Sequence, residues 1–235
     1  MQLMIASEVI LIIFLSFLLA AVILFIILVF YILRLLKIST KLKAKQFKKF
    51  NTFALPGQIV FLGDSLTEFY QIEEFFYNLK IYNRGIASDT TDGVLERLEE
   101  NVILIKPRKV FIQIGTNDYH KKNELIFSNI KKIIERIQEA LPDTKVYLIS
   151  LYPINHKAKI YSRLFTSSRK NSRIIELNKL LEEYANNIKI PYIDVHSHLL
   201  DEKGNLKKEY TVEGLHISFE GYEVITEVLR PYVLE

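Results

Sequence analysis

A serine, a histidine and a carboxylate occur in this chain where together they could carry out acyl transfer. Ser65 stands in a Gly-Asp-Ser-Leu tetrapeptide directly after the apolar run Ile59–Leu62. Serine needs a neighbouring base to become a nucleophile, and the base needs a group that orients it. A Glu-Gly-Leu-His tetrapeptide near the C-terminus supplies both, as Glu213 and His216. The sequence predicts Ser65 as nucleophile, His216 as general base and Glu213 as the orienting acid.

Other interpretations of these residues stay open at the level of sequence. Ser65 could be a helix N-cap, since a lone Gly-Asp-Ser recurs in turns. The third member of the triad could be Asp194, or His216 could work in a dyad oriented by a backbone carbonyl. His196 and His198 form a His-x-His pair, but no further ligands stand at metal-binding spacing, so we expect no metal site.

An asparagine follows a second apolar run and could stabilise a developing oxyanion. Asn117 stands in a Gly-Thr-Asn-Asp tetrapeptide after Val110–Ile114. A side-chain amide there could donate a hydrogen bond to the tetrahedral intermediate of acyl transfer. Asn-Asp pairs are also common in turns, and we expect Asp118 to hold the turn.

The elements that must position these residues alternate along the chain. The expected strands are Ile59–Leu62, Ile81–Asn83, Val110–Ile114, Val146–Leu151 and Tyr192–Val195. The expected helices are Thr91–Leu104, Asn123–Leu141, Ile174–Asn187 and Phe219–Tyr232. This alternation predicts an α/β fold with a parallel sheet covered by helices on both faces. Such sheets place their sites at the carboxyl ends of the strands, which is where Ser65 and Asn117 fall.

Four blocks in this order resemble the SGNH (GDSL) hydrolase superfamily, and within it the platelet-activating-factor acetylhydrolase-like bacterial esterases. They contain Ser65, the segment 83–90, Asn117 and the pair Glu213/His216, and the resemblance covers residues 57–234. It implies a three-layer α/β/α flavodoxin-like fold with a parallel five-stranded sheet, and a serine esterase that needs neither cofactor nor metal.

The resemblance also implies an oxyanion hole made by the backbone N–H groups of Ser65 and Ser88 and by the Asn117 amide. Two positions depart from the family pattern. Ser88 stands where the family usually has a glycine, and Glu213 stands where it usually has an aspartate. A backbone donor tolerates the first change if φ is compatible, and a glutamate can still orient the imidazole.

Val9 to Leu33 is an uncharged run long enough to cross a membrane. Its 25 residues would span about 37 Å as a helix, against roughly 30 Å of hydrocarbon. A buried core helix and a cleaved signal peptide are the alternatives. We expect an anchor over residues 1–33, a basic juxtamembrane stalk over 34–56 and a hydrolase domain over 57–235.

Seven basic residues lie between Arg34 and Lys49, whereas residues 1–50 contain one acid, Glu8. The positive-inside bias therefore predicts a single-pass protein with a cytoplasmic domain, and an extracytoplasmic domain is the alternative. The stalk could lie along an anionic leaflet or be solvated. From Asn51 onward there are 24 bases and 26 acids, which gives no reason to expect nucleic-acid binding.

The chain is therefore expected to be a membrane-anchored serine esterase acting on an acyl ester of a lipid or a sugar. An O-acyltransferase with the same triad and a non-catalytic membrane adaptor that retains the fold are the alternatives. The absence of cysteine excludes disulfides and thiol catalysis. One basic run could be a solvated helix face or could meet an anionic headgroup or sugar phosphate: Arg163, Arg169, Lys170 and Arg173.

Overall fold

A computed structural model describes the backbone of residues 2–235 and the side chains of residues 9–32, 34–35 and 38–235. The chain divides into two compact units, residues 1–42 and residues 43–235. Helix α1 (Gln2–Phe50) begins in the first and ends in the second. Its stretch Val9–Ile32 has a mean hydropathy of 3.4 and no buried residue, so it is long and apolar enough to cross a membrane.

The larger unit contains the parallel five-stranded sheet that the sequence predicts. Its strands are β1 (Ile59–Gly63), β2 (Ile81–Gly85), β3 (Lys109–Gln113), β4 (Lys145–Ile149) and β5 (Tyr192–Ile193). Their spatial order is β2-β1-β3-β4-β5, and every pair is parallel. The order is that of the flavodoxin-like α/β fold. β2 lies on one side of β1 and β3 lies on the other, so the order of the strands reverses between β1 and β3. The segments that follow β1 and β3 therefore meet at the carboxyl edge of the sheet.

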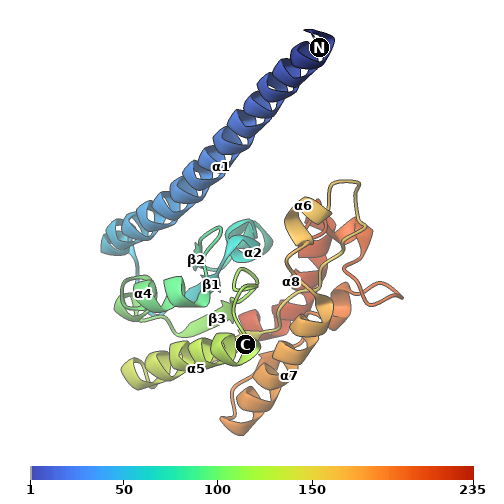
Figure 1. Ribbon diagram of the computed structural model, residues 1–235. Coiled ribbons are helices and arrows are strands. Elements are labelled where there is room, and N and C mark those ends of the chain that lie inside the picture. The colour runs from blue at the N-terminus through green and yellow to red at the C-terminus, as the bar shows by residue number, and fades with distance from the viewer. Residues whose placement is uncertain (1) are drawn as a thin grey trace. The chain divides into compact units, whose positions relative to one another are not determined.

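Helices cover both faces of the sheet and make three layers (Figure 1). One face carries α4 (Thr91–Asn101), α5 (Asn123–Ala140) and α7 (Asn171–Asn187). The other carries α8 (Phe219–Leu234) and two one-turn helices, α2 (Ser65–Glu68) and α3 (Ile72–Phe75). Another one-turn helix, α6 (Arg163–Thr166), lies in the connection from β4 to α7. The one-turn helices do not follow from the sequence pattern, because four residues are too few to show a helical period.

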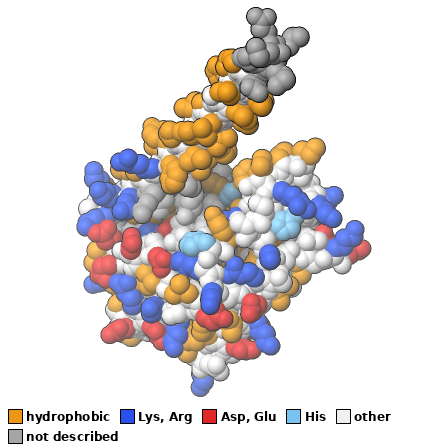
Figure 2. Space-filling view, in the orientation of Figure 1, with side chains coloured by type: hydrophobic (Ala, Val, Ile, Leu, Met, Phe, Trp, Pro, Cys, Tyr) orange, Lys and Arg blue, Asp and Glu red, His pale blue; other side chains and the backbone are white. Residues whose placement is uncertain are grey.

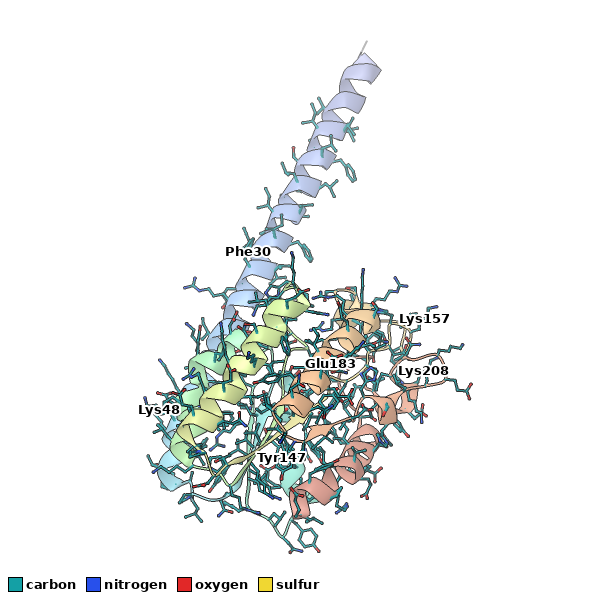
Figure 3. All side chains as sticks on the ribbon, turned by 90° about the horizontal axis from the view of Figure 1, so that it is seen from below. Phe30, Lys48, Tyr147, Lys157, Glu183 and Lys208 are labelled. Atoms are coloured by element: carbon teal, nitrogen blue, oxygen red, sulfur yellow. The ribbon has the colours of Figure 1, made fainter. Side chains whose placement is uncertain are left out.

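Alternating side chains of each strand fill the two layers of core. In β1, Val60 and Leu62 pack under α4 and α5, whereas Ile59 and Phe61 face α8, and all four are almost fully buried. On the α8 face the rings of Phe61, Phe111 and Tyr147 stack across three strands with centroid distances of 4.5 and 4.4 Å. Tyr147 of β4 is labelled in Figure 3. A sheet buried on both faces is a rigid support for the loops at its carboxyl edge.

The C-terminal end of α1, residues 43–50, packs within the larger unit. Phe47 is buried, and the Arg84 guanidinium lies 4.7 Å from the centre of its ring. Lys43 forms an ion pair with Glu68, whose other oxygen accepts the N–H of Ala87. Residues 43–50 are thus in contact with α2 and β2. The domain limits given above for the anchor, stalk and hydrolase remain predictions.

Candidate active site

Ser65 lies at the first residue of α2, immediately past the end of β1. A Cβ on Gly63 would come within 2.4 Å of the Gln113 carbonyl oxygen, so the strand end requires glycine. Asp64 then caps α2 by accepting the N–H of Leu66 at 2.9 Å. The predicted nucleophile is therefore held on a short, tightly connected turn from strand to helix.

His216 and Glu213 are brought to Ser65 by a tight turn before α8. His216 Nε2 lies 3.1 Å from Ser65 Oγ, and His216 Nδ1 lies 2.6 Å from Glu213 Oε1. The same Glu213 oxygen accepts the backbone N–H of His216. Gly214 has a φ of 102°, and a Cβ there would lie 2.1 Å from the Asn155 carbonyl oxygen, so this turn also depends on glycine. The three side chains form one continuous chain of hydrogen bonds.

The two alternatives for the orienting group do not match these contacts. Asp194 lies after β5, is exposed, and accepts the N–H of Ser197 at 3.1 Å. His216 Nδ1 meets a carboxylate oxygen, whereas a dyad would have it meet a backbone carbonyl. Glu213 is 4% exposed, so its negative charge is held out of water next to the imidazole.

The three predicted oxyanion donors come from the segments after β1, β2 and β3. Ser88 has a φ of 65°, the left-handed conformation that a glycine in its place would adopt without strain. In the part of the chain that the structure describes, the N–H groups of Ser65 and Ser88 donate to no protein group. Asn117 Nδ2 donates to the Asp89 carbonyl oxygen at 3.0 Å, which leaves its second N–H. These groups can therefore serve as hydrogen-bond donors to a substrate oxygen.

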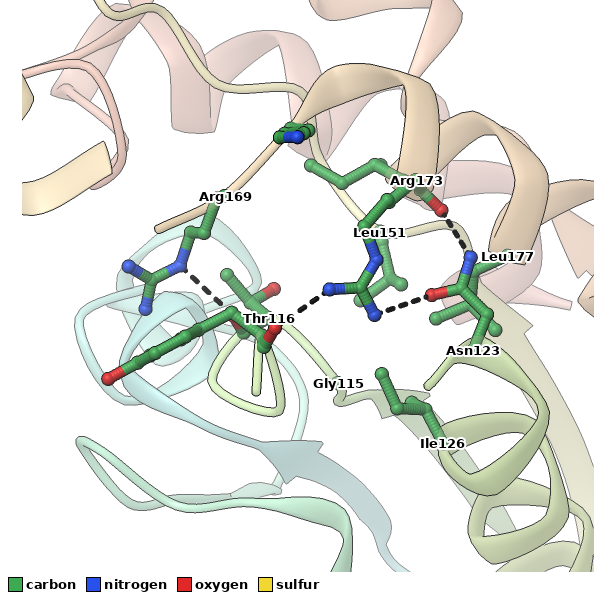
Figure 4. A pocket seen from close by; sticks show the side chains of 11 residues that line it. Gly115, Thr116, Asn123, Ile126, Leu151, Arg169, Arg173 and Leu177 are labelled. Carbon is green, nitrogen blue, oxygen red and sulfur yellow. Dashed lines mark hydrogen bonds between the residues drawn. The ribbon is translucent and has the colours of Figure 1, made fainter. Parts of the chain in front are cut away.

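Arg169 orients the Asn117 amide, a role that the sequence analysis missed. Its Nη2 donates to Asn117 Oδ1 at 2.9 Å. Its Nε donates to the Thr116 carbonyl at 3.0 Å, as Figure 4 shows. A guanidinium is only a donor, so it fixes which end of the amide carries the N–H groups. Arg169 and Arg173 border a pocket of about 40 Å³ that none of the predicted site residues lines. The basic run gave no signal that two of its members turn inward.

Buried Arg97 ties the strand ends of the site together. It donates to the Asp89 carboxylate at 2.7 Å and to the carbonyls of Gly63 and Arg84 at 3.0 and 2.9 Å. Both side chains of the ion pair are at most 5% exposed. Asp89 directly follows Ser88, so this network fixes the loops after β1 and β2 relative to each other. Asp118 similarly holds the start of α4, by accepting from the Thr91 N–H and hydroxyl at 3.0 and 2.8 Å.

Replacing Arg97 by methionine is expected to lower the free energy of unfolding by roughly 3–5 kcal/mol, because it leaves the Asp89 carboxylate buried without its cationic partner. Denaturation of the detergent-solubilised protein, followed by tyrosine near-UV circular dichroism, measures this. Arg230→Met, which removes an exposed ion pair with Glu227, is the matched control and is expected to leave unfolding unchanged. An equal effect of the two substitutions would contradict the structural role of Arg97.

The Asp64 carboxyl gives the larger unit a pH-dependent stability. It is fully buried, its Oδ2 has no hydrogen-bond partner, and burial raises its pKa from 3.8 to about 7. Since the pKa is higher in the folded state, stability is greatest below pH 4, falls between pH 4 and pH 7, and is constant above. Asp64→Asn lacks this dependence. Its free energy of unfolding, relative to wild type, is expected to rise by about 3–4 kcal/mol over this window.

Unfolding at a series of pH values, with wild type and Asp64→Asn measured side by side, tests this expectation. Titrating groups that do not interact with Asp64 are common to both proteins and cancel in the difference. A difference that does not change with pH would show that the Asp64 carboxyl titrates alike in the folded and unfolded chain.

Substituting Asn117 by alanine is expected to lower kcat by about 10²–10³-fold, the usual effect of removing one oxyanion donor. The loss arises in kcat because the amide donates most strongly to the oxygen that becomes charged in the transition state. Steady-state hydrolysis of a soluble ester measures it. Asn186→Ala, an exposed asparagine at the end of α7, is the control. Loss confined to KM would assign Asn117 to ground-state binding instead.

Aromatic side chains border the His216 ring on two sides. The ring of Phe69 lies 5.3 Å and that of Phe165 6.4 Å from the His216 ring. A groove of about 420 Å³ opens beside His216 and Glu213. Its apolar lining includes Phe69, Phe75, Val212 and Phe219. This lining suits an apolar chain lying next to His216.

Among the described residues, no group of three or more His, Asp or Glu side chains is arranged to hold a metal ion. His196 is buried with an unpartnered Nε2, and His198 lines a separate surface groove of about 610 Å³ near α8. The His-x-His pair therefore takes no part in the arrangement around Ser65.

The sequence matches the model of the GDSL-like lipase/acylhydrolase family over residues 61–224. It is 30% identical to the N-acylneuraminate cytidylyltransferase of Escherichia coli O18:K1:H7, over 79% of this chain but 42% of that protein. Platelet-activating factor acetylhydrolase IB subunit alpha1 of Bos taurus is 28% identical, over 75% of each chain.

Solved structures are similar as well. A Streptococcus pneumonia protein named as a platelet activating factor has a TM-score of 0.82 and 29% identity, over 87% of this chain and 97% of that chain. A GDSL-like lipase of Bacteroides thetaiotaomicron has a TM-score of 0.71 at 27% identity, over 81% and 96%.

Proposed function

We propose that Ser65, His216 and Glu213 are the catalytic triad of this chain, which belongs to the GDSL-like lipase/acylhydrolase family and is thus an ester-hydrolysing serine hydrolase. In this proposal the substrates are acyl esters of lipids at a membrane. The observation that carries the triad is the hydrogen-bond chain from Ser65 Oγ through the two imidazole nitrogens to Glu213 Oε1, with distances of 3.1 and 2.6 Å.

In this proposal Ser65 Oγ attacks the ester carbonyl while His216 Nε2 takes its proton. Glu213 accepts the Nδ1–H, holds the tautomer and stabilises the imidazolium that forms. The oxyanion receives hydrogen bonds from the Ser65 and Ser88 backbone N–H groups and the Asn117 amide. His216 then gives its proton to the leaving alcohol. A water molecule, deprotonated by the same nitrogen, releases the acyl group from Ser65.

Two observations support a lipid as the ester. The groove of about 420 Å³ beside His216 is bordered by aromatic side chains, which bind methylene groups better than sugar hydroxyls. Helix α1 carries a stretch long enough to hold the enzyme in a bilayer, where lipid esters are concentrated. In this proposal a single acyl chain lies in the groove with its carbonyl at Ser65, and α1 holds the enzyme at the bilayer that supplies the lipid.

Hydrolysis of a series of soluble esters with acyl chains of increasing length tests the substrate class. Each added methylene that enters the groove is expected to raise kcat/KM about fourfold, from roughly 0.8 kcal/mol of burial. Phe219→Ser is expected to weaken this dependence, whereas Leu104→Ser, at an exposed site outside the groove, is the control. A preference for acetyl esters would overturn the lipid assignment. Product analysis with added sugar acceptors would reveal acyl transfer.

We further propose that Val9–Ile32 spans the membrane with the larger unit in the cytoplasm, on the basis of the basic residues that follow the span. The chain has no cysteine, so a single Lys131→Cys variant offers one reactive thiol on the exposed surface of α5. A membrane-impermeant maleimide applied to intact cells is expected to leave this thiol unmodified until the membrane is opened. Modification in intact cells would reverse the orientation.

A further inference from the structure

The segment from residue 144 to residue 175 contains seven bases and no acid, whereas the chain from Asn51 onward has 24 bases and 26 acids. It forms β4, the connection with α6, and the start of α7. A concentration of one sign of charge on a chain that is otherwise balanced indicates either an internal role or a partner of opposite charge.

Lys145 forms an ion pair with Glu235, and the structure divides the other six bases into two groups. Arg169 and Arg173 turn inward and donate to groups of the loop after β3, including Asn117 Oδ1 and the Tyr119 carbonyl. The outward group lies on the connection around α6. Its members, all exposed, are Lys157, Lys159, Arg163 and Lys170. Among the described residues none of these four forms an ion pair, so their charges are available to a partner.

The same connection exposes large apolar side chains. Ile160 is fully exposed, Leu164 is 81% exposed, and Tyr161 and Phe165 are about half exposed. In the space-filling view, hydrophobic side chains lie beside lysine and arginine side chains at the upper right edge of the larger unit, where Figure 1 has α6 (Figure 2). Lys157 points out from the same connection (Figure 3). Solvent exposure of so many apolar groups next to a site is unfavourable in water and indicates a contact surface.

Buried polar side chains hold this connection in place and force its apolar residues outward. The Ser162 hydroxyl accepts the Lys159 N–H at 2.7 Å, and the Thr166 hydroxyl donates to the Ser162 carbonyl at 2.9 Å. Ser162 and Thr166 are both fully buried. The Thr166 hydroxyl also contacts His156 Nδ1 at 2.7 Å. Since the small polar residues occupy the inner side, the outward position of Ile160 and Leu164 is a property of the folded chain.

We propose that residues 157–165 form an interfacial surface that inserts its apolar side chains into an anionic bilayer and delivers the lipid ester to Ser65. The chemistry of the surface matches a leaflet, because apolar groups enter the acyl boundary while lysine and arginine meet phosphate at headgroup level. Each base held near an anionic leaflet strengthens the contact about fivefold. The neighbouring loop 201–209 carries three bases and three acids and adds no opposing charge. The inference rests on the lipid-ester function proposed above.

The position of this surface explains how it would serve catalysis. Phe165, at its inner end, lies next to the ring of His216, and Phe69 borders that ring from α2. A lipid leaving the leaflet along Phe165 would reach the groove beside His216 without passing through water. The ester would then need to cross only the headgroup region to meet Ser65 Oγ.

Spin-label depth measurements on the full-length protein test the surface directly. The chain has no cysteine, so Ile160→Cys and Glu183→Cys each carry one nitroxide, the second on the far end of α7. Both are reconstituted in phosphatidylcholine vesicles with and without phosphatidylglycerol. In the anionic vesicles the label at 160 is expected to be more accessible to oxygen and less to a water-soluble nickel complex. The label at 183 is expected to remain water-exposed. A label at 160 that stays water-exposed in both kinds of vesicle would overturn the proposal. A label at 160 that is equally buried without anionic lipid, or in detergent, would also overturn it, because such burial would indicate contact with a second copy of the chain.

A kinetic comparison ties the surface to the reaction. Leu164→Ser is expected to lower hydrolysis of a lysophospholipid in anionic vesicles by about tenfold or more, from the lost insertion of one large apolar side chain. Hydrolysis of a soluble short ester is expected to stay unchanged. Leu104→Ser, an exposed leucine before β3, is the control for both substrates. Because the depth measurement needs no turnover, its failure is distinguishable from failure of the ester-hydrolase function.

Discussion

His216→Ala is expected to lower kcat for ester hydrolysis by about 10⁶-fold, since removal of the base from a catalytic triad usually costs as much as removal of the whole triad. His216 Nε2 lies 3.1 Å from Ser65 Oγ. Without it, the hydroxyl keeps its proton through the attack, and the leaving alcohol receives none. Steady-state and single-turnover kinetics on the purified protein measure the effect.

The variant must be shown to fold, because alanine leaves the buried Glu213 carboxylate with only the His216 backbone N–H as a partner. Tyrosine near-UV circular dichroism of His216→Ala and of His216→Gln provides this check. A control at His198, an exposed histidine away from Ser65, is expected to retain full activity as His198→Ala. Retention of more than a hundredth of kcat by folded His216→Ala would contradict a base role, given the usual cost of losing a catalytic histidine.

Glu213→Gln is expected to lower kcat by about 10³–10⁴-fold, because it removes the negative charge that stabilises the imidazolium and lets an amide donate to Nδ1, which favours the wrong tautomer. The same oxygen of Glu213 accepts both the side-chain and the backbone N–H of His216, so the substitution also disturbs the turn.

Glu213→Asp is the matched comparison, since it keeps the charge and restores the residue usual in the family. Its side chain is one methylene shorter, so we expect kcat between those of wild type and Glu213→Gln. The order wild type, aspartate, glutamine identifies charge as the contribution of this position. If glutamine and aspartate prove equally active, Glu213 acts only as a support of the turn before α8.

The strands, helices and layers followed from the sequence because unbroken apolar runs alternate with stretches of helical period. The apolar run of β1 and the helical spacing in α5 are local signals, and both elements begin at the predicted residue. Helix α4 ends at Asn101, three residues before the predicted end at Leu104. A separate turn of 3₁₀ helix then begins at Ile103. Such a change of helix type preserves the apolar pattern and is therefore invisible in it.

The positioning residues of the site could not be predicted, because their contacts join distant parts of the chain. Arg169 meets Asn117 across 52 residues, and Arg97 meets Gly63 across 34. Nothing in the local pattern distinguishes an arginine that turns inward from one that is solvated. The basic run illustrates this, since Arg163 points to solvent while Arg169 is partly buried beside the site. The predicted roles of Ser88 and Glu213, in contrast, rested on block order and are compatible with the observed φ and distances.

Fluorophosphonate labelling of isolated membranes that contain either wild type or Ser65→Ala tests whether Ser65 is the nucleophile, because the reagent reacts with an activated serine. We expect wild type to be labelled at Ser65 and the Ser65→Ala variant to be unlabelled at equal abundance. Folded wild type that resists the reagent, or a Ser65→Ala variant that is labelled as strongly, would contradict Ser65 as the nucleophile.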